Sequence, residues 1–190
     1  MIGFAVLVLL VVLLVCYGVV LYNGLVRARN EVKLSWSNID VLLAQRHDEL
    51  PKLIEVCRRY MQHESETLER VAQARSAVDT ARSSGDVSSV SRAEGALRTG
   101  LSGLYAVAER YPNLKADALF QNLQARVSGL ETAIADRREV YNEAANAQNV
   151  RVETFPDSLV AGFFDFPAAK LLKFAADEKS NVDMKAAFGS

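Results

Sequence analysis

An uninterrupted apolar run opens the chain, and the first charged side chain is Arg27. Between residues 1 and 22 only Gly3 and Gly18 fall outside the apolar set. A helix rises about 1.5 Å per residue, so this run reaches roughly 30 Å, the thickness of the hydrocarbon core of a bilayer. No basic residue precedes the run and no small-residue cleavage pattern follows it. A retained transmembrane anchor over residues 1–22 is therefore favoured over the alternative, a cleaved secretory signal.

Amphipathic patterning begins after this run. From residue 30 to residue 78, apolar side chains, Trp36 among them, recur at spacings that alternate between three and four, which is typical of a helical stripe. Arg46 interrupts the stripe, and a polar group at such a position in a coiled coil fixes the register of the helices. Pro51 predicts a kink, because proline lacks the backbone donor and clashes with the preceding turn. The stripe therefore predicts one long, kinked helix.

Two further helices are expected. Residues 83–89 are rich in turn formers and predict a loop. A second apolar stripe follows over residues 93–111 and ends at Pro112. Asn113 is a suitable N-cap for a third helix, whose stripe extends over residues 116–144.

These stripes bury one another most simply in a bundle. The fold class expected is all-α: the transmembrane helix is followed over residues 23–150 by an elongated up-and-down antiparallel helical bundle with a long, kinked first helix. The helix lengths differ, so part of the first stripe has no partner within the bundle. A second copy, another protein or the C-terminal segment must cover it. This surplus predicts a homo-oligomer or a protein partner.

The C-terminal segment, residues 151–190, changes character near Pro156. Large apolar residues spaced three and four apart predict a helix with an apolar face over residues 155–166, available to the bundle, to the bilayer surface or to a partner. Beyond Lys179 the residues are small or charged, and we expect them to be mobile. The residues expected to contact a partner or the membrane are Phe155, Leu159, Val160, Phe163, Phe164, Phe166, Lys170 and Lys173.

The span and its flanking charges also predict an orientation. Arg27, Arg29 and Lys33 follow the apolar run and are opposed only by Glu31. The positive-inside rule then places the bulk of this single-pass chain in the cytoplasm, with a periplasmic or extracellular placement as the alternative. In the cytoplasm Cys57 would stay a reduced thiol.

Composition and motifs narrow the function. Lys and Arg total 22 against 23 Asp and Glu, so there is no bulk positive charge for a phosphate backbone, and we expect no nucleic-acid partner. His47 and His63 stand beside carboxylates, but consecutive helical residues fan out around the axis and do not converge on a metal. Zinc-protease, P-loop, Rossmann and nucleophile-elbow patterns are missing from the sequence. We therefore expect no catalytic residue, cofactor or metal; an enzyme built on either histidine is a third alternative.

Several motifs, in one order, resemble the LemA family over about residues 20 to 166. They include Tyr22-Asn23-Gly24-Leu25-Val26, Ser35-Trp36-Ser37-Asn38-Ile39-Asp40-Val41, Asp48-Glu49-Leu50-Pro51, Tyr111-Pro112-Asn113-Leu114-Lys115-Ala116 and Leu159-Val160-Ala161-Gly162-Phe163-Phe164. The family usually has Asn where this chain has Lys52, and a Tyr-Asn pair where it has Gln148-Asn149. The resemblance implies a membrane-anchored α-helical domain of the bacterial envelope, without an established catalytic activity or cofactor.

The predicted anchor, the apolar stripes and the resemblance to the LemA family together favour a non-enzymatic scaffold in the bacterial inner membrane. This scaffold would self-assemble, recruit an unidentified protein partner, or do both. The alternative is a membrane-remodelling or lipid-surface-binding protein that acts through residues 155–166. Structural roles are expected for Trp36, Arg46, Pro51 and Pro112.

Overall fold

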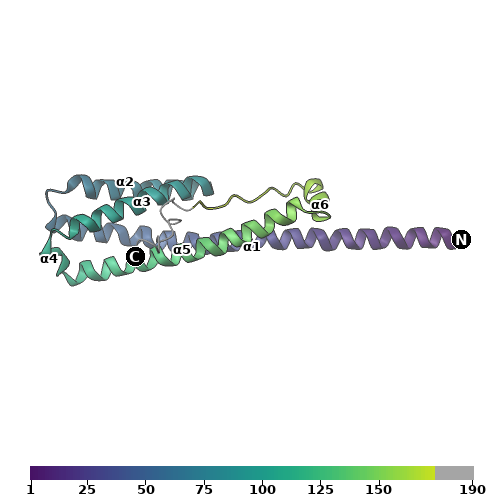
Figure 1. Cartoon of the computed structure of the whole chain (residues 1–190), viewed down its shortest axis with the longest axis horizontal. Coiled ribbons are helices and arrows are strands. Elements are labelled where there is room, and N and C mark those ends of the chain that lie inside the picture. Colours follow the sequence, from purple (N-terminus) through teal and green to yellow (C-terminus); the bar gives the residue numbers. More distant parts are fainter. Residues whose placement is uncertain (174–190) are drawn as a thin grey trace, which may run out of the picture. The chain divides into compact units, whose positions relative to one another are not determined.

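A computed structural model describes residues 1–173, and these residues are mostly helical with no strand among them (Figure 1). The mobile end expected beyond Lys179 lies outside the described residues. The all-α class and the helical bundle are confirmed. The helices are α1 (Ile2–Tyr60), α2 (Ser65–Ser84), α3 (Val87–Ala108), α4 (Pro112–Lys115), α5 (Ala118–Glu153) and α6 (Asp157–Phe163).

The chain forms two compact units. Unit 1 consists of Met1–Ile39 and Asp136–Leu171, and unit 2 consists of Asp40–Ala135 together with Leu172 and Lys173. Both α1 and α5 therefore contribute residues to each unit. The three consecutive segments expected from the sequence divide the chain along its length, whereas each compact unit pairs an early stretch with a late one.

Unit 2 is built around an aliphatic core that α1, α2, α3 and α5 supply. Because apolar residues on each helix recur every three or four positions, each helix presents one continuous face to this core. The buried members are Leu50, Leu53, Ile54, Val56, Cys57, Met61, Leu68, Val71, Ala74, Val78, Leu97, Leu101, Leu104, Ala108, Leu114, Phe120, Leu123 and Val127.

The stripe over residues 30–78 is shared by two helices rather than carried by one, so the expected single helix is wrong. α1 ends at Tyr60 and α2 begins at Ser65. The chain turns between them while Met61, in the turn itself, remains fully buried in the unit 2 core. The apolar spacing therefore continues across the turn, because both helices face the same core. Pro51 lies inside α1 and is exposed.

Two other boundaries differ from expectation. The loop expected over residues 83–89 is reduced to Gly85 and Asp86. Gly85 takes a left-handed conformation (φ 69°), which glycine adopts without steric cost, and the Asp86 carboxylate accepts the N–H of Ser89 at 3.1 Å. Asn113 does not cap the third long helix, because residues 112–115 form the short α4.

The cap of α5 is Asp117. Its carboxylate accepts the backbone N–H groups of Leu119 (2.7 Å) and Phe120 (3.2 Å), and the hydroxyl of Tyr60 also donates to it at 2.8 Å. These hydrogen bonds, that of Tyr60 foremost, lower the pKa of the Asp117 carboxyl, and the same contact raises the pKa of Tyr60. A cap at this position joins the end of α1 to the start of α5.

In unit 1, α1 packs on two other parts of the same chain. Leu25, before the stripe begins, packs with Ala161 and Phe166 of the C-terminal segment. Within the stripe, Trp36 lies edge-on to Tyr141 of α5, with 5.7 Å between ring centroids. The C-terminal segment therefore covers α1 at Leu25, and α5 contacts the stripe at Trp36.

Candidate functional site

The helix expected over residues 155–166 is shorter than predicted: only Asp157–Phe163 form α6, and the chain then makes a tight reversal. The N–H of Phe166 donates to the carbonyl of Ala161 at 2.9 Å, five residues back, which is the hydrogen bond of a Schellman helix end. Asp165 occupies the position where glycine is usual and has a φ of 53°. The reversal turns Phe166 back toward α1.

Aromatic contacts then fasten this reversal to α1. Tyr22 lies 4.8 Å from Phe164 and 5.7 Å from Phe166, measured between ring centroids. The guanidinium of Arg29 stands 5.0 Å from the centroid of the Phe166 ring, in a cation–π arrangement. Tilted and edge-on pairs of this kind add stabilisation beyond the apolar area that they bury. Phe166 is accordingly buried, beside Leu25.

A close approach at Gly24 admits a charged side chain against α1. A Cβ at this position would clash with the Arg151 guanidinium, so a larger residue would displace that group. Nε of the same guanidinium donates to a carboxylate oxygen of Asp157 at 2.7 Å. Asp157 lies in the first turn of α6, where a negative charge suits the helix dipole. Arg151 thus links α1, α5 and α6.

Polar side chains of α5 hold the extended stretch that follows. Asn149 pairs with both backbone groups of Ala169: its amide nitrogen donates to the carbonyl at 3.0 Å and its oxygen accepts the N–H at 2.7 Å. Gln148 donates to the carbonyl of Pro167, and the hydroxyl of Tyr141 donates to that of Lys170, both at 2.8 Å. The Gln-Asn pair that departs from the family pattern therefore has a definite structural role here.

The structure separates the expected contact residues into two groups. Phe155, Leu159 and Phe163, spaced four apart, are 79%, 67% and 83% exposed, and Phe164 is 53% exposed. These four define the α6 apolar surface. Val160 is half-buried and Phe166 is buried, whereas Lys170 and Lys173 have exposed side chains.

Arg46 belongs to a buried charge cluster in unit 2. It forms an ion pair with Glu94, and both side chains are buried. Nearby, burial raises the pKa of the Glu131 carboxyl, against the opposing attraction of Arg46 and Arg98. The burial of Glu94 and Glu131 could not be predicted from the apolar spacing, because it is set by helices distant along the chain.

The last residue for which a structural role was expected, Pro112, is the first residue of α4, where its missing N–H costs no hydrogen bond.

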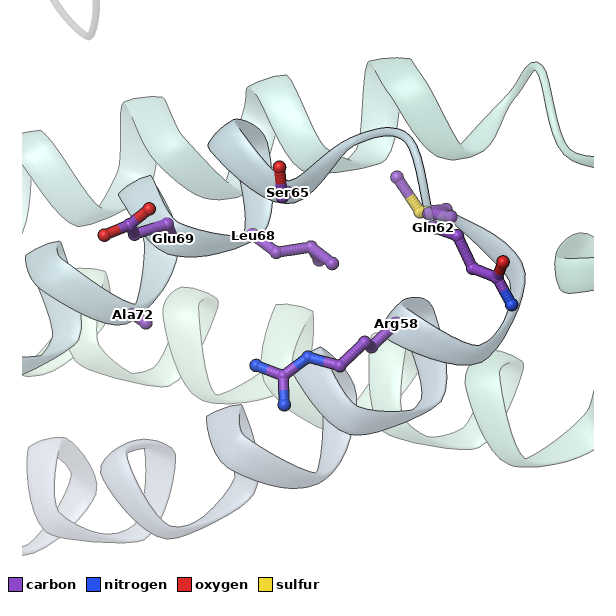
Figure 2. Close-up of a pocket in the computed structure, with 7 residues that line it drawn as sticks. Arg58, Gln62, Ser65, Leu68, Glu69 and Ala72 are labelled. Carbon is purple, nitrogen blue, oxygen red and sulfur yellow. The ribbon is translucent and has the colours of Figure 1, made fainter.

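Several pockets open on the surface of unit 2. One, of about 470 Å³, lies at the α1–α2 turn, with Met61, Leu68 and Ala72 as its apolar part. Figure 2 shows Arg58 of α1 and Leu68 of α2 projecting into the space between the two helices. Another, of about 690 Å³, surrounds Glu49, whose buried carboxylate accepts hydrogen bonds from Arg126 (2.6 Å) and Lys52 (3.0 Å).

The side chains considered for catalysis or metal binding lie apart from one another. His47 already has a hydrogen-bond partner, and Cys57 is unreactive. Nε2 of His47 lies 2.6 Å from Nη2 of Arg75, and a guanidinium can only donate, so this nitrogen accepts and is not open to a metal. His63 is exposed in the α1–α2 turn. Burial raises the pKa of the Cys57 thiol to about 12, so the thiol stays protonated at neutral pH. Among residues 1–173, no three His, Cys, Asp or Glu side chains are grouped to hold a metal ion.

The N-terminal part of α1 is long and apolar enough to cross a membrane, and none of its most apolar window is buried by protein. Protein begins to cover α1 at residues 21–25, and Leu25 is the first fully buried side chain. That is where Tyr22 meets Phe164 and Phe166. The α6 apolar surface is therefore attached to α1 at the end of the uncovered apolar stretch.

Comparisons with known proteins agree with the motifs. The model of the LemA family matches residues 35–187. Protein LemA of Metamycoplasma hominis is 27% identical over 165 residues, which are 85% of this chain and 73% of that protein. Magnetosome proteins MamQ 1 and MamQ 2 of Paramagnetospirillum magneticum are each 31% identical over 78 residues, which are 41% of this chain and only 29% of theirs.

Proposed function

The chain belongs to the LemA family, and from this premise we propose that it is a non-enzymatic, membrane-anchored helical scaffold that recruits a partner protein or assembles with itself. The family is not known as an enzyme family, and the apolar N-terminal helix together with family membership indicates a membrane-anchored protein. The observation that carries the proposal is the pocket at the α1–α2 turn, which opens on the surface of a bundle with a closed core.

The pocket at the α1–α2 turn is the surface that we assign to the partner. Its apolar part can accept an aliphatic or aromatic side chain, and its rim carries Arg58, Gln62 and Glu69, which can fix orientation by hydrogen bonds (Figure 2). A buried apolar anchor within a polar rim is the usual form of a binding hot spot.

Photo-cross-linking in intact cells tests this assignment. A photoreactive amino acid at Gln62, on the pocket rim, is compared with the same amino acid at exposed Ser102 on α3. We expect a discrete cross-linked product from position 62 and none from position 102. A product twice the mass of the chain supports self-assembly, and a product of another mass supports a partner. Absence of a product at position 62, with the protein at normal abundance, would overturn the assignment.

The proposed location is the bacterial inner membrane, with the bulk of the chain on the cytoplasmic side. The support is the charge that follows the apolar stretch, where Arg27, Arg29 and Lys33 outnumber Glu31. A fluorescent reporter and an alkaline phosphatase, fused separately after Ser190, distinguish the two sides. Fluorescence without phosphatase activity supports a cytoplasmic bundle, and the reverse result would place it outside.

A second candidate function is membrane remodelling through the C-terminal segment. The observation that favours it is the α6 apolar surface, because contiguous exposed apolar side chains mark sites of interaction with proteins or membranes. Full-length protein reconstituted in vesicles tests it. Electron cryomicroscopy should show a change in vesicle size or shape that is lost in the variant Phe155→Ser, Leu159→Ser, Phe163→Ser; unchanged vesicles with the unsubstituted protein would reject remodelling.

A further inference from the structure

We infer that the α6 apolar surface lies in the headgroup–acyl boundary of the same bilayer that α1 crosses, and so acts as a second, interfacial contact beside the span. The inference deepens the lipid-surface function and rests on the proposed anchoring by α1. Its occupant is a lipid surface, and remodelling is not required for it.

The first argument is position. Residues 1–20 of α1 have no buried side chain, and protein cover begins only at residues 21–25. The C-terminal segment is the part of unit 1 that meets α1 at that level, since Phe164 lies 4.8 Å from Tyr22. Phe163 in turn lies 4.9 Å from Phe164. An unbroken chain of ring contacts therefore joins the end of the apolar stretch to the α6 apolar surface.

The second argument is chemistry. Leu159 and Phe163 lie one turn apart on α6 and Phe155 just precedes the helix; all three are mostly exposed, whereas Ala161 of α6 is buried within unit 1. A short amphipathic helix with this division lies in the plane of a membrane, with its apolar face about 5–10 Å into the boundary region. Tyrosine is also enriched at this depth, and Tyr22 is the residue against which Phe164 and Phe166 pack.

The third argument is rigidity. The surface is not on a loose tail: Arg151 bridges Gly24 and Asp157, and the reversal at Asp165 returns Phe166 to a buried place beside Leu25. These contacts hold α6 at one level of α1. When α1 spans the bilayer, the exposed side chains of α6 therefore arrive at the boundary without a further change in conformation.

Depth-dependent quenching of tryptophan fluorescence tests the inference on the full chain in vesicles. Trp36 is the only tryptophan, so Trp36→Phe gives a background into which single tryptophans are placed. The test positions are Leu159→Trp and Phe163→Trp. The matched control is Leu34→Trp, an exposed apolar position of the same unit that lies about 18 Å further along α1 than Tyr22. Leu14→Trp reports the span itself.

Lipids brominated near the headgroup end of their chains should quench tryptophans 159 and 163 at least about twofold more than tryptophan 34, as expected for side chains within the boundary layer. Lipids brominated near the bilayer centre should quench tryptophan 14 most. The aqueous quencher acrylamide should reach position 34 but not positions 159 and 163.

The outcomes separate the two proposals. If tryptophan 14 is quenched while 159 and 163 behave like 34, anchoring stands and the interfacial contact is overturned. If 159 and 163 are shielded from acrylamide but not quenched by lipid, another copy of the chain covers the surface, and the inference fails. If tryptophan 14 is not quenched by lipid, the anchoring fails and the inference falls with it.

Discussion

Unit 2 and unit 1 share the two long helices α1 and α5 but are stabilised in different ways. In unit 2, apolar side chains of α1 to α5 form one closed core, and Arg46 and Glu94 form a buried ion pair. In unit 1, an irregular segment is bound to α1 and α5 by ring contacts and by side chains that pair with its backbone groups. Apolar burial therefore dominates unit 2, whereas unit 1 depends on satisfying the polar backbone of a non-helical stretch.

The two units should therefore lose stability in different ways when a side chain is substituted. A close-packed aliphatic core loses stability whenever volume or charge pairing is altered, and the loss is felt throughout the unit. A docked segment can detach while the helices beneath it persist, because local opening needs only its own contacts to break. The predictions below test this contrast.

The largest effect is expected at the buried ion pair of unit 2. Arg46→Met leaves the buried carboxylate of Glu94 without its cation, and we expect the free energy of unfolding to fall by about 3–5 kcal/mol. The double variant Arg46→Met, Glu94→Leu removes both charges and should recover most of this loss. Urea denaturation followed by circular dichroism in detergent measures both. A single variant as stable as the unsubstituted protein would contradict the contrast.

A similar but smaller effect is expected from a leucine in the unit 2 core. Leu104→Ala opens a cavity at a fully buried position and should lower the free energy of unfolding by about 3 kcal/mol. Leu159→Ala makes the same chemical change on the exposed α6 apolar surface and should alter it in detergent by less than about 0.5 kcal/mol. Equal losses at the two positions would show that α6 is stabilised by core packing.

A local effect is expected in unit 1. Asn149→Ala removes both hydrogen bonds to Ala169, and we expect the protection of amides 166–173 from hydrogen exchange to fall by about 1–2 kcal/mol. Asn146→Ala, at an exposed position on the same helix, is the matched control and should leave these amides unchanged. Loss of protection in the core helices of unit 2 as well would refute independent opening of the segment.

The smallest effect is a pH dependence in unit 2. Burial raises the pKa of Glu131 above its unfolded value, so the stability that this carboxyl contributes is complete below the unfolded pKa, about 4.3, and is lost as the pH rises through the folded pKa. Glu131→Gln cannot ionise. It should therefore stabilise unit 2 at neutral pH and leave it nearly unchanged in acid, and thermal melts at the two pH values measure this difference. A variant that is destabilised at neutral pH would show that attraction to Arg46 and Arg98 outweighs burial.

Much of unit 2 follows from sequence periodicity, because each helix buries a stripe of fixed spacing. The break at residues 61–64 does not, since Met61 continues the apolar spacing through the turn. The α6 apolar surface is partly foreseeable, because a spacing of four places Leu159 and Phe163 on one side of a helix; Phe155 lies before α6, which the spacing does not predict. The burial of Phe166 is not, because it depends on the reversal at Asp165, a conformation that favours glycine.

The polar contacts of unit 1 could not be predicted from the sequence. Gln148 and Asn149 have the composition of an ordinary helix surface, and only their tertiary neighbours make them partners of the backbone at Pro167 and Ala169. The same holds for Arg151, whose place depends on a glycine 127 positions earlier in the sequence, at Gly24. Such pairings connect distant residues and leave no periodic signal.

α1 runs without a break from the uncovered residues 1–20 into Tyr22, so the number of residues between them fixes how the two parts are oriented. One residue inserted there would turn the docking side of α1 by about 100° and shift it by about 1.5 Å relative to the preceding residues. Residues 22–29 would then present α6 to a different side of the span, even though every contact of α6 survived. In this stretch the number of residues, more than their identity, sets the side of the spanning helix on which α6 lies. Insertions and deletions here should therefore be tolerated far less than substitutions.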